Sequence, residues 1–134
     1  YTARATASGA GRNGTVKSND GTATPLDIKL SMPKALGGDG KGHNPEQLFA
    51  SGYSACFLGA LQAVAAQKGK KDAVKEAKID VAVHIGPPTD KPGFGIAVDI
   101  KVHGVHDKDL VEAAHEFCPY SRTLAHGAVV KVTS

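Results

Sequence analysis

The chain contains little cysteine, no tryptophan and only a slight excess of positive charge. Two cysteines in 134 residues are too few for a secreted disulfide scaffold, and they lack the CxxC spacing of a zinc ribbon or redox pair. The net charge of +3 comes without a basic stripe interleaved with aromatics, so we expect no nucleic-acid partner. With an apolar fraction of 41%, these features favour a cytoplasmic globular protein.

The amino-terminal third has the pattern of a small antiparallel meander. Alternation predicts half-buried strands over 1–8 and 26–32, with a weaker strand at 15–17 between turn-rich segments. A glycine-rich segment, 33–43, follows, and its glycines predict an irregular loop over the body of the protein. Because no linker or repeat divides the chain, we expect a single domain over residues 1–134.

The stretch NPEQLFASGYSACFLGALQAVAA, from Asn44 to Ala66, predicts one long helix. Asn44 suits the N-cap, Pro45 the first helical position, and Glu46 the first turn, where the helix dipole favours an acid. Apolar residues occupy every side, so other protein must surround the helix, and we expect a partner subunit to help cover it. Polar residues such as Gln62 interrupt the run and argue against a membrane span.

The second half predicts a hairpin, a helix and a final strand. KIDVAVHIG and FGIAVDIKVH, residues 78–86 and 94–103, alternate cleanly and are joined by the turn PPTDKPG. A helix capped by Asp107 follows and should stop at Cys118, ahead of a proline. The final segment AVVKVTS predicts a closing strand. Together these elements indicate an α+β fold built from antiparallel strands and a buried helix.

Cys56 lies in the middle of the long predicted helix, and Cys118 lies at the end of the next one. Free cysteine is among the most buried residue types and often acts as a small hydrophobe, so core packing alone can explain Cys56. A rigid thiol on a central helix and a mobile thiol at a helix end also suit an attacking and a resolving cysteine. Attack on a peroxide would give a sulfenic acid, which the second thiol condenses to a disulfide. Composition leaves both interpretations open.

Thiol chemistry of this kind needs a thiolate, and apolar surroundings raise a thiol pKa, so a nearby cation is required. Arg12 in the turn GAGRNG is one candidate, and Glu46 could hold its guanidinium through a bidentate contact. Taken alone, Arg12 is more simply a solvated turn residue. Glu46 and Cys56 are ten positions apart, which is about 15 Å and about 80° on a straight helix. They can serve one site only if the helix breaks near Gly52 or Glu46 crosses a dimer interface.

The six histidines invite a metal interpretation, but their spacing is poor. His115 and Cys118 share one helical face, and His103 and His106 have the same spacing, yet neither pair has a third ligand near in sequence. The glycines of GAGRNG form no dinucleotide fingerprint, because no helix follows them. We therefore expect no metal and no bound cofactor.

NPEQLFASGYSACFLGAL, followed much later by AAHEFCPYS, resembles the organic hydroperoxide resistance proteins of the Ohr/OsmC superfamily. The resemblance spans most of the chain, since YTARATASGAGRNG, LDIKLSMPKALGGDG and GFGIAVDIKV stand in family order. It implies an intertwined homodimer with antiparallel sheets around long buried central helices. It also implies a bacterial thiol peroxidase that reduces organic, often lipid-derived, hydroperoxides to alcohols. EQLFASGYSACF and CPYS are more similar to the Ohr branch than to the OsmC branch.

By position, the resemblance makes Cys56 the peroxidatic thiol and Cys118 the resolving thiol, joined as a disulfide during the cycle. Arg12 matches the family's catalytic arginine, and Glu46 matches the carboxylate that orients it. The resemblance also implies recycling by dihydrolipoyl groups of a lipoylated protein, a dithiol reductant, rather than by thioredoxin. After the second motif the chain departs from the family, because RTLAHGA at 122–128 stands where Ohr members usually continue with a sequence such as ATRGN.

Four aromatic residues are candidates for a substrate pocket that favours alkyl hydroperoxides over hydrogen peroxide: Phe49, Tyr53, Phe57 and Tyr120. Aromatic residues at helical spacing are equally explained as plain core. The sequence thus predicts a cytoplasmic, homodimeric Ohr-type peroxidase. The alternatives are an OsmC-branch peroxidase, or a non-catalytic dimer that binds a lipid-like ligand or senses redox state.

Overall fold

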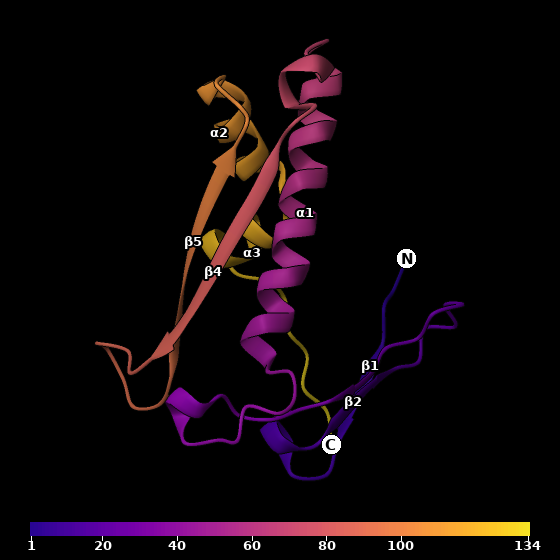
Figure 1. Ribbon diagram of the computed structural model, residues 1–134, viewed down its shortest axis with the longest axis vertical. Coiled ribbons are helices and arrows are strands. Elements are labelled where there is room, and N and C mark those ends of the chain that lie inside the picture. Colours follow the sequence, from indigo (N-terminus) through magenta and orange to yellow (C-terminus); the bar gives the residue numbers. More distant parts are fainter. The chain divides into compact units, whose positions relative to one another are not determined.

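The computed structural model describes residues 1–134, which fold into two compact units. The first unit is Tyr1–Phe49 and the second is Ala50–Ser134, so the boundary falls within the first turns of the long helix α1 (Pro45–Gln67). Figure 1 shows the elements of both units. The expectation of a single domain over the whole chain stays a prediction.

The first unit contains a three-stranded antiparallel sheet in the order β1-β2-β3, which is the predicted meander. Its strands are β1 (Ala5–Ser8), β2 (Thr15–Ser18) and β3 (Asp27–Lys29). The third strand is shorter than the sequence predicts. Beyond Lys29 the chain leaves the sheet, because Leu30 forms an isolated parallel bridge with His43 and no longer pairs with β2.

The glycine-rich segment 33–43 is more regular than predicted. It contains the short helix η2 (Lys34–Leu36), which Gly37 ends with a φ of 82° in the left-handed region. At Gly38 an added Cβ would lie 2.0 Å from the carbonyl oxygen of Met32, so only glycine fits this close approach. The predicted irregular loop is confirmed for residues 37–42, and the one departure from it is the short helix Lys34–Leu36, which Gly37 terminates.

The Asp39 side chain stabilises the segment 33–43 through hydrogen bonds. The Asp39 carboxylate accepts hydrogen bonds from the Ser31 hydroxyl and from the Lys41 backbone N–H. These bonds, the Ser31 bond above all, lower the pKa of Asp39 below its usual value. The loop is therefore tied to the end of β3 by a charged side chain.

The helix α1 begins and ends close to where the sequence predicts. The Asn44 side chain accepts a hydrogen bond from the Gln47 N–H at 2.8 Å, which is an N-cap contact, and Pro45 is the first helical residue. The helix continues past Gly52 without interruption, so the predicted alternative of a break near that residue is wrong. Its residues buried in the protein are Tyr53, Phe57, Ala60, Leu61, Val64 and Ala65.

The second unit contains the predicted hairpin of β4 (Lys78–Gly86) and β5 (Gly95–His103). The register runs from Lys78 opposite His103 to Gly86 opposite Gly95, and the short helix η3 (Lys71–Val74) leads into β4 from α1. Figure 1 shows the two strands as long arrows beside α1, and α2 and α3 belong to the same unit. Period-two alternation identified this hairpin correctly.

The helix α2 (Lys108–Phe117) is also as predicted, with Asp107 as its cap. The Asp107 side chain accepts hydrogen bonds from the N–H groups of Asp109 and Leu110, and it pairs with Lys70 Nζ at 2.7 Å. The helix ends at Phe117 because Cys118 has extended backbone angles ahead of a proline.

A further helix, α3 (Pro119–His126), was not predicted. Pro119 stops α2 and also occupies the first position of α3, where a missing N–H costs nothing and the fixed φ suits a helix. The sequence analysis treated the proline only as a stop. Cys118 is consequently the single residue between two helices.

The predicted closing strand is absent. Residues 128–134 have no regular structure, and Val129, Val130 and Val132 are exposed. A strand needs a neighbouring strand to complete its backbone hydrogen bonds, and this segment pairs with neither sheet. Alternating valines are therefore insufficient here to form a strand.

By length and composition alone, α1 could cross a membrane, a test that the core helix of a soluble protein also passes. Several of its apolar side chains are buried within the protein.

Candidate functional site

The fold of the second unit brings the two cysteines together. Cys56 lies on α1, Cys118 lies between α2 and α3, and the Cys118 thiol donates a hydrogen bond to Cys56 Sγ at 3.8 Å. Both thiols are free. A disulfide has an S–S distance of about 2.05 Å, so the sulfurs need approach by less than about 2 Å to be joined. The two residues can therefore act as one redox pair.

The two thiols differ in exposure. Cys118 is completely buried, with 0% of its surface exposed, whereas Cys56 is half-buried. A molecule arriving from solvent reaches Cys56 more readily. This difference suits an attacking role for Cys56 and a resolving role for Cys118.

Burial raises the pKa of the Cys56 thiol above its usual value. The neighbouring Cys118 adds to the rise, because two thiolates this close would repel each other. The backbone N–H of Tyr120 acts in the opposite direction by hydrogen-bonding the Cys56 sulfur. Tyr120 lies in the first turn of α3, where N–H groups have no partner within the helix and favour a negative charge. This helix start is thus one stabiliser of a Cys56 thiolate.

The Tyr120 side chain packs over α1. Its ring lies 5.6 Å from the ring of Tyr53, at an angle of 54°. A Cβ added to Gly52 would lie 3.3 Å from the Tyr120 hydroxyl oxygen, so glycine leaves room for the ring. The contact fixes the start of α3, and with it the N–H that faces Cys56.

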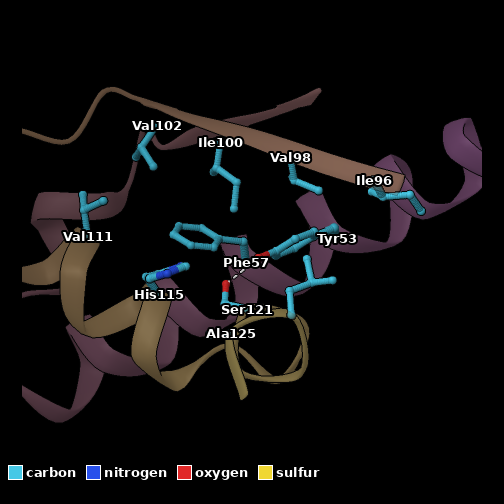
Figure 2. Close-up of a pocket in the computed structure, with 11 residues that line it drawn as sticks. Tyr53, Phe57, Ile96, Val98, Ile100, Val102, Val111, His115, Ser121 and Ala125 are labelled. Carbon is cyan, nitrogen blue, oxygen red and sulfur yellow. Dashed lines mark hydrogen bonds between the residues drawn. The ribbon is translucent and has the colours of Figure 1, made fainter. Parts of the chain in front are cut away.

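An apolar cavity of about 560 Å³ lies among α1, β5, α2 and α3 (Figure 2). This volume is in the range of small-molecule sites. Its walls are the inner face of β5 and side chains of the three helices: Tyr53, Phe57, Ile96, Val98, Ile100, Val102, Val111, His115, Ser121, Leu124 and Ala125. The composition of the walls suits an alkyl chain.

The sequence analysis predicted only part of this cavity. Tyr53 and Phe57 line it, as expected of the candidate pocket residues. Tyr120 does not line it but packs on Tyr53, and Phe49 belongs to the first unit and is not among the lining residues. The pocket assignments of Tyr120 and Phe49 stay predictions.

Two polar residues in the cavity were missed. Ser121 is 2% exposed, and its hydroxyl lies 2.7 Å from the Tyr53 hydroxyl, the dashed contact in Figure 2. His115 stacks at an angle against Phe57, with ring centres 6.5 Å apart. The CPYS motif contains Ser121, but only the unpredicted helix α3 turns it toward α1. His115 was considered only as a metal ligand.

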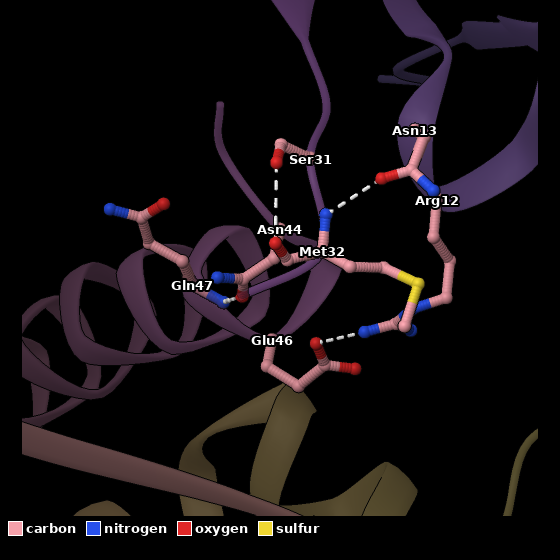
Figure 3. A network of polar contacts seen from close by, with 7 residues as sticks. All are labelled: Arg12, Asn13, Ser31, Met32, Asn44, Glu46 and Gln47. Carbon is pink, nitrogen blue, oxygen red and sulfur yellow. Dashed lines mark hydrogen bonds and ion pairs between the residues drawn. The ribbon is translucent and has the colours of Figure 1, made fainter. Parts of the chain in front are cut away.

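In the first unit, the structure pairs Arg12 with Glu46 (Figure 3). Arg12 Nη2 and Glu46 Oε2 form an ion pair in which the Glu46 side chain is 13% exposed and the Arg12 side chain 35%. The hydrogen bond from Arg12 lowers the pKa of Glu46 and raises that of Arg12. Glu46 also lies in the first turn of α1, where the helix dipole favours its charge. The predicted pairing of these residues is therefore present through the contact of Nη2 with Oε2, and its bidentate form stays a prediction.

The turn that carries Arg12 is built from local constraints. Arg12 lies in the short helix η1 (Gly11–Asn13), and the Asn13 side chain accepts a hydrogen bond from the Met32 N–H at 2.9 Å. At Gly14 a Cβ would lie 2.1 Å from the Ser8 carbonyl oxygen, which only glycine avoids. The glycines of this turn thus set the backbone from which the guanidinium reaches Glu46.

The structure brings no third possible metal ligand to either histidine pair. No group of three or more His, Cys, Asp or Glu side chains is placed to hold an ion. His103 contacts Asp80 at 2.7 Å, and His84 contacts Asp99 at 3.1 Å, both across the β4–β5 hairpin. These are exposed two-residue contacts.

Comparison with known proteins relates the whole chain to one family. The sequence model of OsmC-like proteins matches residues 38–133. The organic hydroperoxide resistance protein of Xanthomonas axonopodis pv. citri is 48% identical over 139 residues, covering 99% of this chain and 93% of that protein.

Solved structures also relate this chain to organic hydroperoxide resistance proteins. A crystal structure of an organic hydroperoxide resistance protein from Legionella pneumophila has a TM-score of 0.80 and 37% identity, covering 95% of this chain and 91% of that one. The crystal structure of OhrB from Bacillus subtilis has a TM-score of 0.77 and 40% identity, covering 94% of this chain and 92% of that chain. The mixed α and β architecture, with antiparallel sheets and a long helix, is shared with these proteins. The chain therefore belongs to the OsmC-like family, among relatives named organic hydroperoxide resistance proteins.

Proposed function

We propose that this protein is a thiol peroxidase that reduces organic hydroperoxides to alcohols. The observation that carries the proposal is the pairing of half-buried Cys56 with buried Cys118 at 3.8 Å. The names of its relatives support the substrate class, and the apolar cavity flanked by Tyr53 and Phe57 supports a preference for alkyl peroxides.

In the first step, the Cys56 thiolate attacks the outer oxygen of the hydroperoxide. An S–O bond forms as the O–O bond breaks, sulfur is oxidised to the sulfenic acid, and the leaving alkoxide takes a proton to become the alcohol. The Tyr120 N–H at the start of α3 supports the thiolate, because it hydrogen-bonds the sulfur.

In the second step, the Cys118 thiol attacks the Cys56 sulfur. The S–S bond forms, and the sulfenic oxygen leaves as water with the Cys118 proton. Cys118 is suited to this movement, because it is the single non-helical residue between α2 and α3. A dithiol reductant, which the family resemblance identifies as dihydrolipoyl groups of a lipoylated protein, then returns both thiols by exchange.

The thiolate needs more support than α3 alone provides, because burial raises the Cys56 pKa. In the proposal, Arg12 supplies the positive charge and donates to the peroxide oxygens, while Glu46 orients the guanidinium through their ion pair. Since α1 is unbroken between Glu46 and Cys56, the proposal keeps the alternative in which Glu46 serves Cys56 across a dimer interface.

A homodimer is part of the proposal. Along α1, Ala55, Gly59, Gln62 and Ala66 are exposed at helical spacing, and three of them are small enough to let a second helix approach closely. We expect size-exclusion chromatography with light scattering to give twice the chain mass of 13.8 kDa. A monomer at micromolar concentration would contradict it. The cytoplasm, where a dithiol pool is available, is the proposed location.

The proposed function is tested by following peroxide consumption with dihydrolipoamide as reductant. We expect repeated turnover of cumene hydroperoxide by the wild type, none by Cys56→Ser, and rapid loss of activity in Cys118→Ser. Binding or oxidation without reductant-dependent turnover would instead make the protein a lipid binder or a redox sensor.

A further inference from the structure

A second hollow adjoins the apolar cavity. It has a volume of about 330 Å³ and shares three lining residues, His115, Ser121 and Ala125, with the larger cavity. The residues that it adds are charged or titratable: Glu116, Arg122 and His126. An apolar compartment and a polar one are thus adjacent and are lined in part by the same residues.

Arg122 has no charged partner. Its guanidinium makes no ion pair, including with Glu116 in the same hollow, and the side chain is exposed. Its backbone N–H donates to the Cys118 carbonyl at 3.0 Å, so Arg122 lies one helical turn from the resolving cysteine. Arg122 therefore adds a permanent positive charge to the lining of the hollow beside the apolar cavity.

The opposing charges in the hollow are few. Glu116 is its one acid, and His115 and His126 are its other titratable groups. A guanidinium with free N–H groups prefers a carboxylate, which it can bind through two parallel hydrogen bonds. A ligand that fits both compartments has an apolar chain and a carboxylate.

We infer that Arg122 is a specificity residue that binds the carboxylate of a fatty-acid-type hydroperoxide, while the alkyl chain occupies the cavity lined by Phe57 and β5. The inference rests on the proposed peroxidase function for its substrate, but binding of the acid itself does not require turnover. Arg122 opens the segment 122–128, where the sequence departs from the usual family pattern.

Binding is tested first, by isothermal titration calorimetry of the reduced protein with decanoate and with 1-decanol, which have the same chain length. We expect tighter binding of decanoate by the wild type. Arg122→Gln should raise the decanoate Kd about tenfold and leave decanol unchanged, and Arg122→Lys should restore part of the loss. Arg4→Gln, which removes an exposed arginine of the first unit, is the matched control and should change neither ligand. Equal affinity of the wild type for the two ligands, or equal effects of the two arginine substitutions, would overturn the inference.

Turnover is tested second, with the hydroperoxide of an unsaturated fatty acid and with its methyl ester. Arg122→Gln should raise KM for the acid about tenfold with kcat unchanged, and should not affect the ester or cumene hydroperoxide. If the peroxides are reduced with no dependence on Arg122, the inference is wrong and the proposed function stands. If decanoate binding depends on Arg122 but no hydroperoxide is reduced, the carboxylate site stands and the proposed function is wrong.

Discussion

The Tyr53 hydroxyl lies 2.7 Å from Ser121 Oγ, in a buried hydrogen bond that joins α1 to α3 beside the thiol pair. Because α3 begins directly after Cys118, this bond fixes the helix whose N–H faces the Cys56 sulfur. It therefore links the packing of the second unit to the proposed thiol chemistry.

Removing the Tyr53 hydroxyl should destabilise the protein. Tyr53→Phe leaves the buried Ser121 hydroxyl without this partner and should cost about 1–2 kcal/mol in the free energy of unfolding. Urea denaturation of Tyr53→Phe, Ser121→Ala and the double variant measures the coupling between the two groups. Tyr1→Phe, which removes an exposed hydrogen bond to Asp20, is the control and should change stability little. A double variant whose loss equals the sum of the single losses would show that the bond contributes nothing.

The ion pair of Arg12 and Glu46 predicts a pH dependence of stability. Arg12 lowers the folded-state pKa of Glu46 below its ordinary value of 4.5. The stabilisation is therefore fully present above that value and is lost as the pH falls through the lowered pKa. Denaturation between pH 7 and pH 3 should show a steeper loss for the wild type than for Glu46→Gln. Glu112→Gln, at an exposed position of α2, should retain the wild-type profile.

Arg12 should control the thiolate of Cys56. In the proposed mechanism Arg12 is the cation that offsets burial of Cys56. Under that proposal, Arg12→Ala should raise the Cys56 pKa above that of the wild type. Thiolate absorbance measured as a function of pH gives this shift in pKa. Both proteins should carry Cys118→Ser, so that Cys56 is the only thiol that titrates. The rate of reaction with cumene hydroperoxide should fall by about 10²-fold or more. Unchanged pKa and rate in Arg12→Ala, matching an Arg4→Ala control, would exclude the electrostatic role.

Gly38 should be intolerant of substitution. In Gly38→Ala the new Cβ would meet the Met32 carbonyl oxygen at 2.0 Å, so the loop must move. We expect a loss of about 2 kcal/mol or more in the free energy of unfolding. Gly86→Ala, where an added Cβ meets nothing within 4 Å, should stay within about 0.5 kcal/mol of the wild type. Equal stability of the two variants would show that the loop accommodates the side chain.

Much of the fold could be predicted because its signals are local. The cap at Asn44 with Pro45 marks the start of α1, and strict alternation marks β4 and β5. These features depend on residues within a few positions of each other, so the sequence displays them directly.

The errors arose where the outcome depends on distant partners or where one local signal permits two outcomes. Val130 and Val132 alternate like a strand, but a strand forms only where another strand lies beside it. Pro119 was treated as the end of one helix, although proline is equally suited to begin the next.

The candidate site likewise contains residues that the sequence identified and residues that only the fold could place. The roles of Cys56, Cys118, Arg12 and Glu46 came from a family resemblance, and the structure adds that each pair is in contact within its own unit. Ser121 and Arg122 could not be placed without α3, because only the helix directs one toward Tyr53 and the other toward the polar hollow.

The central claim is that Cys56 and Cys118 form one redox pair that reduces hydroperoxides with apolar organic groups. It is tested most directly by single-turnover stopped-flow with reduced protein and one equivalent of cumene hydroperoxide or hydrogen peroxide, followed by counting of free thiols. The account predicts fast loss of both thiols, a Cys56–Cys118 disulfide in peptide mass spectra, and a strong preference for cumene hydroperoxide. Slow and unselective oxidation, or loss of one thiol without the disulfide, would contradict it.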